Sequence, residues 1–260
     1  MSFTSAMMSG VSGLRANDTA LNVIGNNIAN VNTAGFKSGR TLFEDMLSKS
    51  VDGPNSQIGL GTSVGTVQNQ FTQGGFLSAA NVTDMAINGD GFFAVQDNST
   101  TSTTKFTRDG TFSVDATGKY LVNPNGDKLC DTTGAVIDLT KLPSSSTINK
   151  IAADGTIGYL DASGAQQTST IKIGIARFNN PDGLEKTGNN DFRATTDSGA
   201  SVIAAANQDT TILSNNLEVS NVDMTTQLTS MITTQRAYSA NSKSVTTSDE
   251  MTKTVINLKQ

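Results

Sequence analysis

The 260-residue sequence contains no histidine, no tryptophan and a single cysteine. Without histidine, the chain cannot build a Ser-His-Asp or Cys-His nucleophilic site, and it lacks the commonest metal ligand. Cys130 has no second thiol with which to form an internal disulfide or share a zinc ion. We interpret it as a small, half-buried apolar residue of a strand. The sequence therefore predicts no catalytic, cofactor-binding or metal-binding residues.

Clustered positive charge and long apolar runs are also missing. The chain carries 18 Lys and Arg against 23 Asp and Glu, and its cations are scattered singly. It therefore has no basic stripe of the kind that binds nucleic acid. No apolar run reaches the 18 or so residues of a membrane-spanning helix, so we expect no membrane insertion. Polar residues such as Asn17, Asp18 and Asn22 interrupt any secretory signal near the start, which by itself predicts a cytoplasmic protein.

What the sequence does contain is a helical pattern at each end, where apolar residues recur mostly every three or four positions. These stripes predict two amphipathic helices that need apolar partners, supplied by neighbouring copies if one chain cannot cover them. This pattern favours a self-assembling structural protein over an enzyme. The residues expected to carry assembly are Met7, Val11, Leu14, Leu21, Ile24, Ile28, Asn30 and Phe36 near the start, and Leu217, Met224, Leu228, Met231, Tyr238, Val245, Val255 and Leu258 near the end.

Both predicted helices are intrinsically weak. The first contains Gly10, Gly13 and Gly25, each of which costs roughly 1 kcal/mol relative to alanine. In the second, 14 of the 37 residues from 222 to 258 are Ser or Thr, which are poor helix formers. We therefore expect both ends to be largely disordered in the monomer and to become helical on assembly.

Between the ends, the apolar pattern has the period of two that is typical of strands. Phe112 and Val114 alternate with polar residues, and so do Ile171 and Ile173, while Asn-Gly and Asp-Gly pairs predict tight turns. The sequence thus predicts an α+β fold with a central antiparallel β-rich domain. We expect residues 1–35 and 215–260 to form a terminal helical domain, 36–80 a linker arm and 81–214 the β-rich domain.

Carboxylates in the central region allow a different interpretation, because a pair of them suffices for glycoside hydrolysis. Asp90 and Asp109, however, stand beside glycines in turn dipeptides, where aspartate is favoured for local hydrogen bonding. Asp84 and Asp115 flank predicted strands. We favour the structural interpretation and expect no enzymatic activity.

Four stretches, in order along the chain, carry a resemblance to a known family. Residues 25–37 read GNNIANVNTAGFK and residues 84–95 read DMAINGDGFFAV. Residues 106–129 contain TRDGTFSVD and GKYLVNPNGDKL, and residues 220–251 read SNVDMTTQLTSMITTQRAYSANSKSVTTSDEM. The chain resembles the bacterial flagellar rod and hook axial proteins in these stretches, and with residues 175–199 the resemblance covers nearly the whole sequence.

The resemblance implies an architecture and a set of partners. The terminal helices are expected to pair as an inner coiled-coil layer around a channel, with the β domain outside it. The implied partners are other copies in a helical homopolymer, adjacent rod and hook-filament junction proteins, an assembly cap and the flagellar type III export apparatus. Export by that route implies a flagellar location without a cleaved signal, extracellular in the hook or periplasmic in the rod.

Within the family, the sequence favours a hook subunit and leaves the distal rod as the alternative. Distal rod proteins carry an insertion after the first helical arm, whereas here the sequence between Met46 and Gly59 predicts a short loop. In addition, the residues VINLK at 255–259 are similar to the ending of hook proteins. Against this, the chain has no room for the large outer domain of many hook proteins. A third hypothesis, of another class, is a secreted adhesin whose terminal helices form a small closed oligomer.

Overall fold

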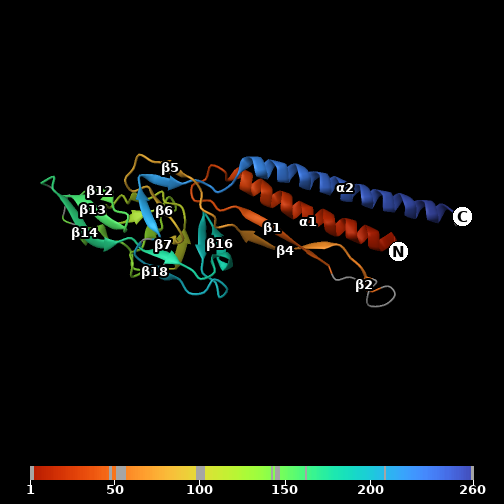
Figure 1. Cartoon of the computed structure of the whole chain (residues 1–260), viewed down its shortest axis with the longest axis horizontal. Coiled ribbons are helices and arrows are strands. Elements are labelled where there is room, and N and C mark those ends of the chain that lie inside the picture. The colour runs from red at the N-terminus through yellow and green to blue at the C-terminus, as the bar shows by residue number, and fades with distance from the viewer. Residues whose placement is uncertain are drawn as a thin grey trace. The chain divides into compact units, whose positions relative to one another are not determined.

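A computed structural model describes residues 3–46, 49–50, 57–97, 103–141, 143, 147–161, 163–207 and 209–258. The chain divides into two compact units (Figure 1). The helical unit comprises residues 1–31, 38–70 and 222–260, and the β unit comprises residues 32–37 and 71–221. Both units therefore combine segments that are far apart in the sequence.

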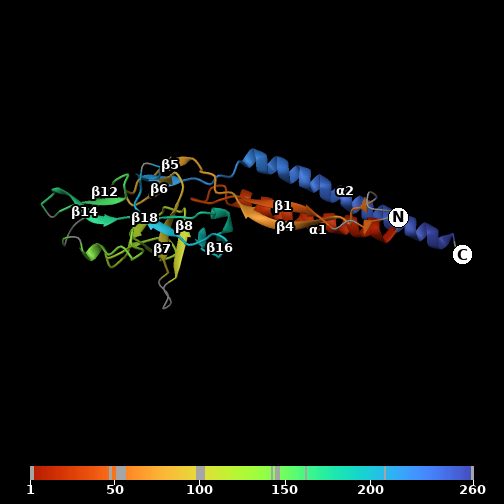
Figure 2. The ribbon, with the colours of Figure 1, turned by 60° about the horizontal axis from the view of Figure 1, so that its bottom comes forward.

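Two long helices, α1 (Phe3–Ala29) and α2 (Met224–Asn257), lie side by side in the helical unit (Figures 1 and 2). They run antiparallel, because Gly10 of α1 lies against Val245 of α2 and Gly13 against Asn241. A Cβ atom on Gly10 would stand 2.7 Å from Val245 Cγ2, and one on Gly13 would stand 2.6 Å from Asn241 Nδ2. The helices thus approach each other closely at glycines. The expected α+β class, with a helix at each end of the chain, is confirmed.

Side chains of α2 and of the residue before it form hydrogen bonds with the helix backbone. The helix begins after Asp223, whose carboxylate accepts a hydrogen bond from the Thr225 backbone N–H at 3.0 Å and caps the first turn. Several hydroxyls, including that of Ser248, donate to the carbonyl four residues earlier. In the structure, α2 is also in contact with α1. The expectation that the ends become helical only on assembly concerns the isolated monomer in solution and stays a prediction.

A long hairpin completes the helical unit. Strand β1 (Gly39–Asp45) pairs antiparallel with β4 (Thr62–Asn69), with an irregularity between Leu42 and Phe43. The shorter strands β2 (Lys49–Ser50) and β3 (Gln57–Ile58) continue the pairing. The segment expected to be an irregular linker is therefore mostly an ordered hairpin packed against α1. Residues 47–48 and 51–56 of the expected linker arm lie outside the described residues.

The β unit contains a large antiparallel sheet with the strand order β16-β17-β8-β7-β11-β10-β9, in which β7 also pairs with β15, and β15 with β18. Its strands are β7 (Phe92–Gln96), β8 (Thr104–Thr107), β9 (Ser113–Val114), β10 (Leu121–Val122), β11 (Lys128–Leu129), β15 (Ile175–Arg177), β16 (Glu185–Gly188), β17 (Asp191–Arg193) and β18 (Val202–Ala204).

Smaller antiparallel sheets complete the β unit. They are β12-β13-β14 (Thr147–Ile151, Thr156–Leu160, Gln166–Lys172), β19-β6 (Thr211–Ser214, Met85–Asn88) and β20-β5 (Asn216–Glu218, Phe76–Ser78). Short 3₁₀ turns lie at Leu139–Lys141 and Pro181–Gly183. A central antiparallel β-rich domain is thus present, as the alternation of apolar residues predicted.

The core of the β unit lies on both faces of strand β7. Phe93 and Val95 belong to one hydrophobic cluster, whereas Phe92 and Ala94 belong to a second cluster. Alternate side chains of a strand point to opposite faces, so β7 is covered on both sides. Burial on both faces explains why all four residues from Phe92 to Val95 are apolar.

Three details of the sequence interpretation need correction. Leu217, expected on the helical stripe, lies in strand β20 opposite Leu77, because α2 begins only at Met224. Val114, expected to alternate with Phe112 as a half-buried position, is exposed while Phe112 is buried. Cys130, expected to be half-buried, is fully buried, and burial raises the pKa of its thiol to about 12, so the thiol is unreactive at neutral pH.

Candidate assembly surfaces

Three buried charged side chains, those of Lys37, Arg108 and Glu218, lie together in the β unit. Each comes from a stretch that is far from the other two in sequence. Glu218 of β20 accepts a hydrogen bond from Lys37 Nζ at 2.6 Å, and its other carboxylate oxygen lies 3.2 Å from Arg108 Nη1. Their side chains are 3% exposed or less. Lys37 lies at the end of the Asn-rich stretch, Arg108 in the TRDG stretch and Glu218 just before α2. This ion network therefore joins the beginning, middle and end of the β unit.

Backbone groups complete the network. Lys37 Nζ also donates to the Thr72 carbonyl at 2.8 Å, Arg108 Nη2 donates to the Gly89 carbonyl at 2.9 Å, and the Gly74 N–H donates to Glu218 at 2.9 Å. Burial lowers the pKa of the Lys37 amine and of the Arg108 guanidinium, while Glu218 acts in the opposite direction. One buried carboxylate thus compensates two buried cations, and its loss would leave both unpaired.

Gly35 allows the chain to pass close to this network. Its φ of +66° lies in the left-handed region, and its N–H donates to the Glu218 carbonyl at 2.8 Å. A Cβ atom at this position would stand 2.5 Å from the carbonyl carbon of Arg108. The Ala-Gly-Phe-Lys sequence at 34–37 therefore needs glycine for both its conformation and its packing.

Asn27 has a comparable role in the helical unit. Its side chain donates to the Gly39 carbonyl at 2.8 Å and accepts from the Gly39 N–H at 2.9 Å, which links α1 to β1. It also donates to Gln227 Oε1 of α2 at 3.2 Å. The sequence analysis did not single out Asn27, Lys37, Arg108 or Glu218. The one signal in the sequence was their position: Asn27, Lys37 and Arg108 lie within stretches that carried the family resemblance, whereas Glu218 does not.

The predicted stripe of α1 does not form its buried face. The side chains of Met7, Leu14, Leu21, Ile24 and Ile28 are only partly buried, and Val11 is exposed. The buried positions of α1 are instead small or polar: Gly10, Gly13, Ala16, Ala20 and Asn27. The helix therefore packs within its own chain through its small residues, and the larger apolar side chains lie at the edges of that contact.

The side chains of the predicted apolar stripe of α2 are exposed or only partly buried. Met224, Leu228, Tyr238, Val255 and Leu258 are exposed, whereas Met231 and Val245 are partly buried. Ser248 is the buried residue among those described in this helix. Large exposed apolar side chains along a helix make this face a candidate interaction surface.

The two remaining predicted residues lie around the end of α1. Asn30 donates from its side chain to the Asn26 carbonyl at 2.9 Å and ends the helix. Phe36 is buried in the β unit, with the Lys186 ammonium 4.2 Å from the centre of its ring. In this structure, Phe36 contributes to the core rather than to an open surface.

Among the central carboxylates, Asp109 lies in a turn. Asp109 bonds to the backbone and hydroxyl of Thr111, as an aspartate in a turn does. The described residues include no cluster of acidic or thiol side chains able to hold a metal ion. Asp191 and Asp127 are both buried, and burial followed by the negative charge of Asp127 raises the pKa of Asp191 to about 7. Among the described helices, neither has both the length and the hydropathy to cross a bilayer.

Comparison with known proteins gives three family matches in chain order. Residues 7–37 match the family described as "Flagella basal body rod protein", residues 86–159 match "Flagellar hook protein FlgE/F/G D1 domain", and residues 213–258 match "Flagellar basal body rod FlgEFG protein C-terminal". Between them, the matches reach both units. They include Lys37 and Arg108 as well as Glu218.

Whole-length relatives agree with these matches. The chain is 40% identical to the flagellar basal-body rod protein FlgG of Bacillus subtilis, over 98% of this chain and 99% of the relative. It is 34% identical to FlgG of Agrobacterium fabrum, over 95% of this chain and 96% of the relative. The flagellar hook protein FlgE of Borreliella burgdorferi is 40% identical over 48% of this chain and 30% of its own length. The chain therefore belongs to the family of flagellar rod and hook axial proteins, which are structural components of the bacterial flagellum.

Proposed function

We propose that the chain is a subunit of the distal rod of the flagellar basal body. The main support is the extent of its similarity: relatives named as basal-body rod proteins match over nearly their whole length. The hook relative, in contrast, is matched over less than a third of its length. This reverses the preference for a hook subunit that the sequence suggested.

The hairpin after α1 supports the same proposal. The sequence interpretation counted the segment from Met46 to Gly59 as a short loop and took that as a sign of a hook protein. In the structure, strands β1 and β4 on either side of this segment pair with each other and pack on α1, and Lys49 and Ser50 pair with Ile58 and Gln57. The described residues that follow the first helix therefore form paired strands, in keeping with the insertion of distal rod proteins.

In this proposal the subunits form a helical homopolymer that transmits torque. The paired helices form the inner layer, as a coiled coil around a channel, and the β units lie outside them. A contact between two different surfaces of neighbouring copies, repeated without closing a ring, generates a helical tube. The exposed apolar residues of α2 supply such a surface. Adjacent rod and hook proteins, the assembly cap and the export apparatus are the other proposed partners, and the rod lies within the cell envelope.

Electron microscopy of basal bodies from a strain that lacks this gene tests the proposal. We expect basal bodies that end before the distal rod and carry no hook. Restoring the wild-type gene on a plasmid, the matched control, should restore both structures. A complete rod that lacks only the hook would overturn the distal-rod proposal in favour of a hook subunit. Discrete closed oligomers of the purified protein, without tubes, would instead support the adhesin hypothesis.

A further inference from the structure

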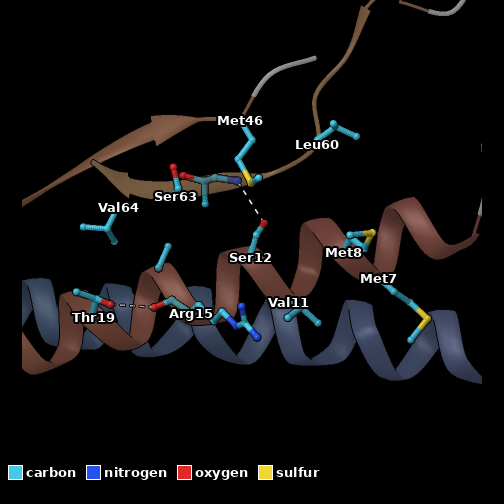
Figure 3. Close-up of a pocket in the computed structure, with 12 residues that line it drawn as sticks. Met7, Met8, Val11, Ser12, Arg15, Thr19, Met46, Leu60, Ser63 and Val64 are labelled. Atoms are coloured by element: carbon cyan, nitrogen blue, oxygen red, sulfur yellow. Dashed lines mark hydrogen bonds between the residues drawn. The ribbon is translucent and has the colours of Figure 1, made fainter. Parts of the chain in front are cut away.

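A groove of about 660 Å³ lies between α1 and the β1–β4 hairpin in the helical unit (Figure 3). Its apolar lining consists chiefly of Met7, Met8, Val11, Met46, Leu60 and Val64. The groove is open to solvent, and Met8, at its edge, is 71% exposed. Arg15 is the one charged side chain in the lining.

The end of α2 carries a surface of matching chemistry. Met251, Val255 and Leu258 follow helical spacing on one face, and the last two are 52% and 81% exposed. Glu250 lies beside this face. Its side chain is exposed, and Asp249 rather than Glu250 forms the nearby ion pair with Lys253.

A chain cannot place this end of α2 in its own groove. Val245 lies against Gly10, so Val255 is ten residues further along α2, roughly 15 Å beyond Gly10 on the side away from Val11 and Arg15. The groove and the helix end therefore face different parts of the unit, and a second copy is needed to bring them together.

We propose that the end of α2, from Glu250 to Leu258, docks in the groove of a neighbouring copy, antiparallel to its α1. The proposal rests on the proposed function, because subunits with the same orientation in a tube keep this antiparallel direction between one α1 and the next copy's α2. The spacing also agrees: Met7 and Arg15 are eight residues apart, as are Glu250 and Leu258, which is about 12 Å in each helix. Leu258 thus reaches the methionines while Glu250 reaches Arg15.

The opposite charges at one end of this contact fix its direction. A parallel arrangement would place Glu250 among the methionines and leave Arg15 beside apolar side chains, at the cost of desolvating both charges without a partner. Because the groove and the helix end are different surfaces, the contact does not close on itself and adds copies indefinitely.

Disulfide cross-linking between two singly substituted proteins tests the contact. Met8→Cys and Val255→Cys proteins are purified, mixed and oxidised, and the linked peptides are identified by mass spectrometry. We expect a link between residues 8 and 255 in the mixture. Val202→Cys, at an exposed apolar position of β18, is the matched control and should form no link with Val255→Cys. Cys130 stays in place, since its buried thiol does not react.

Charge reversal supplies a second test that does not depend on oxidation. Arg15→Glu and Glu250→Arg should each raise the protein concentration needed for polymerisation about tenfold, and the double variant should restore it. Lys243→Glu, on an exposed part of α2, should change it little. Polymers that form without an 8–255 link, or a double variant no better than either single variant, would overturn the docking proposal but not the distal-rod function. If the wild type forms no polymer, the distal-rod function fails, and the cross-link alone decides the docking.

Discussion

At the scale of single residues, Glu218 is the carboxylate that pairs with two buried cations of the β unit. Replacing it with glutamine keeps its size but leaves Lys37 and Arg108 buried without a counter-charge. Breaking a buried ion pair from one side costs about 3–5 kcal/mol. We expect Glu218→Gln to lower the free energy of unfolding by that amount, measured by urea denaturation with fluorescence of the tyrosines.

A surface ion pair provides the control for this substitution. Glu185 pairs with Arg193 at 2.6 Å, but more than half of each side chain is exposed. Exposed pairs contribute about 0–1 kcal/mol, so Glu185→Gln should have little effect. Equal losses from the two variants would show that burial of the network around Glu218 does not matter.

Asp191 gives the β unit a pH dependence. Its pKa is raised to about 7, first by burial and then by Asp127, from an ordinary value of 3.8. Between these pH values the folded state binds a proton that the unfolded state does not, so stability falls as pH rises from about 4 to about 7. We expect Asp191→Asn, which stays neutral and can donate to Asp127, to be progressively more stable than the wild type over this range.

Thermal unfolding of both proteins at half-unit pH steps measures this difference. Asp154, whose pKa is lowered to about 2 by hydrogen bonds from Thr156 and Lys172, titrates mostly below this window and affects both proteins equally. Parallel stability curves from pH 4 to pH 7 would show that Asp191 does not titrate there.

The residues that hold the fold together could not be predicted from local pattern. Lys37 and Glu218 are 181 positions apart, and nothing in the neighbouring sequence marks either charge as buried. A lysine next to Phe36 reads as an ordinary surface residue until the partner strand is known. Absences were more informative, because the lack of histidine directly limits the chemistry available to the chain.

At the scale of elements, the contact between α1 and α2 depends on glycine. Gly13 faces Asn241 with no room for a side chain, whereas a Cβ on Gly25 would meet nothing within 4 Å. We expect Gly13→Leu to destabilise the helical unit by about 1–3 kcal/mol through overpacking. The matched Gly25→Leu should stabilise it by roughly 0.5–1 kcal/mol, because leucine favours the helix.

Circular dichroism at 222 nm during thermal unfolding measures both variants. The same experiment at low protein concentration tests whether the isolated monomer keeps the two helices of the structure or loses them, as the weak propensities of both segments suggest. If Gly13→Leu unfolds no earlier than Gly25→Leu, the close contact at Gly13 is not needed for helix pairing.

Regular elements were predictable where side chains repeat, and less so where they do not. Apolar spacing located both terminal helices, but it misplaced the start of α2, since Leu217 continues the spacing while belonging to a strand. It also missed the buried face of α1, because glycine and alanine carry no apolar signal. The β1–β4 hairpin was read as a linker because its sequence is rich in Gly, Ser, Thr and Gln, and its order comes from packing on α1.

At the scale of the whole molecule, the exposed stripe of α2 is proposed to decide between monomer and polymer. Leu228 is 46% exposed, so an aspartate there is tolerated in the free subunit. In the polymer, the charge would be buried without a partner, at a cost of a few kcal/mol. We expect Leu228→Asp to leave the β unit folded and to raise the concentration needed for tube formation by tenfold or more.

Negative-stain microscopy and sedimentation over a concentration series measure this effect. Ser244→Asp carries the same new charge about 160° around the helix from Leu228 and is also exposed. Met231→Asp is a second variant of the same stripe and should behave like Leu228→Asp. Normal tubes from either stripe variant would show that this surface does not form a subunit contact.

The ion network also has a consequence for how the chain is made. Lys37 and Arg108 leave the ribosome long before Glu218, and until that carboxylate emerges neither cation has its anionic partner. A nascent or prematurely terminated chain that lacks Glu218 therefore cannot form this ion network, however much of the sheet has already been synthesised. The ion network can therefore form only after translation has passed Glu218, and a product that ends earlier keeps two cations without their counter-charge.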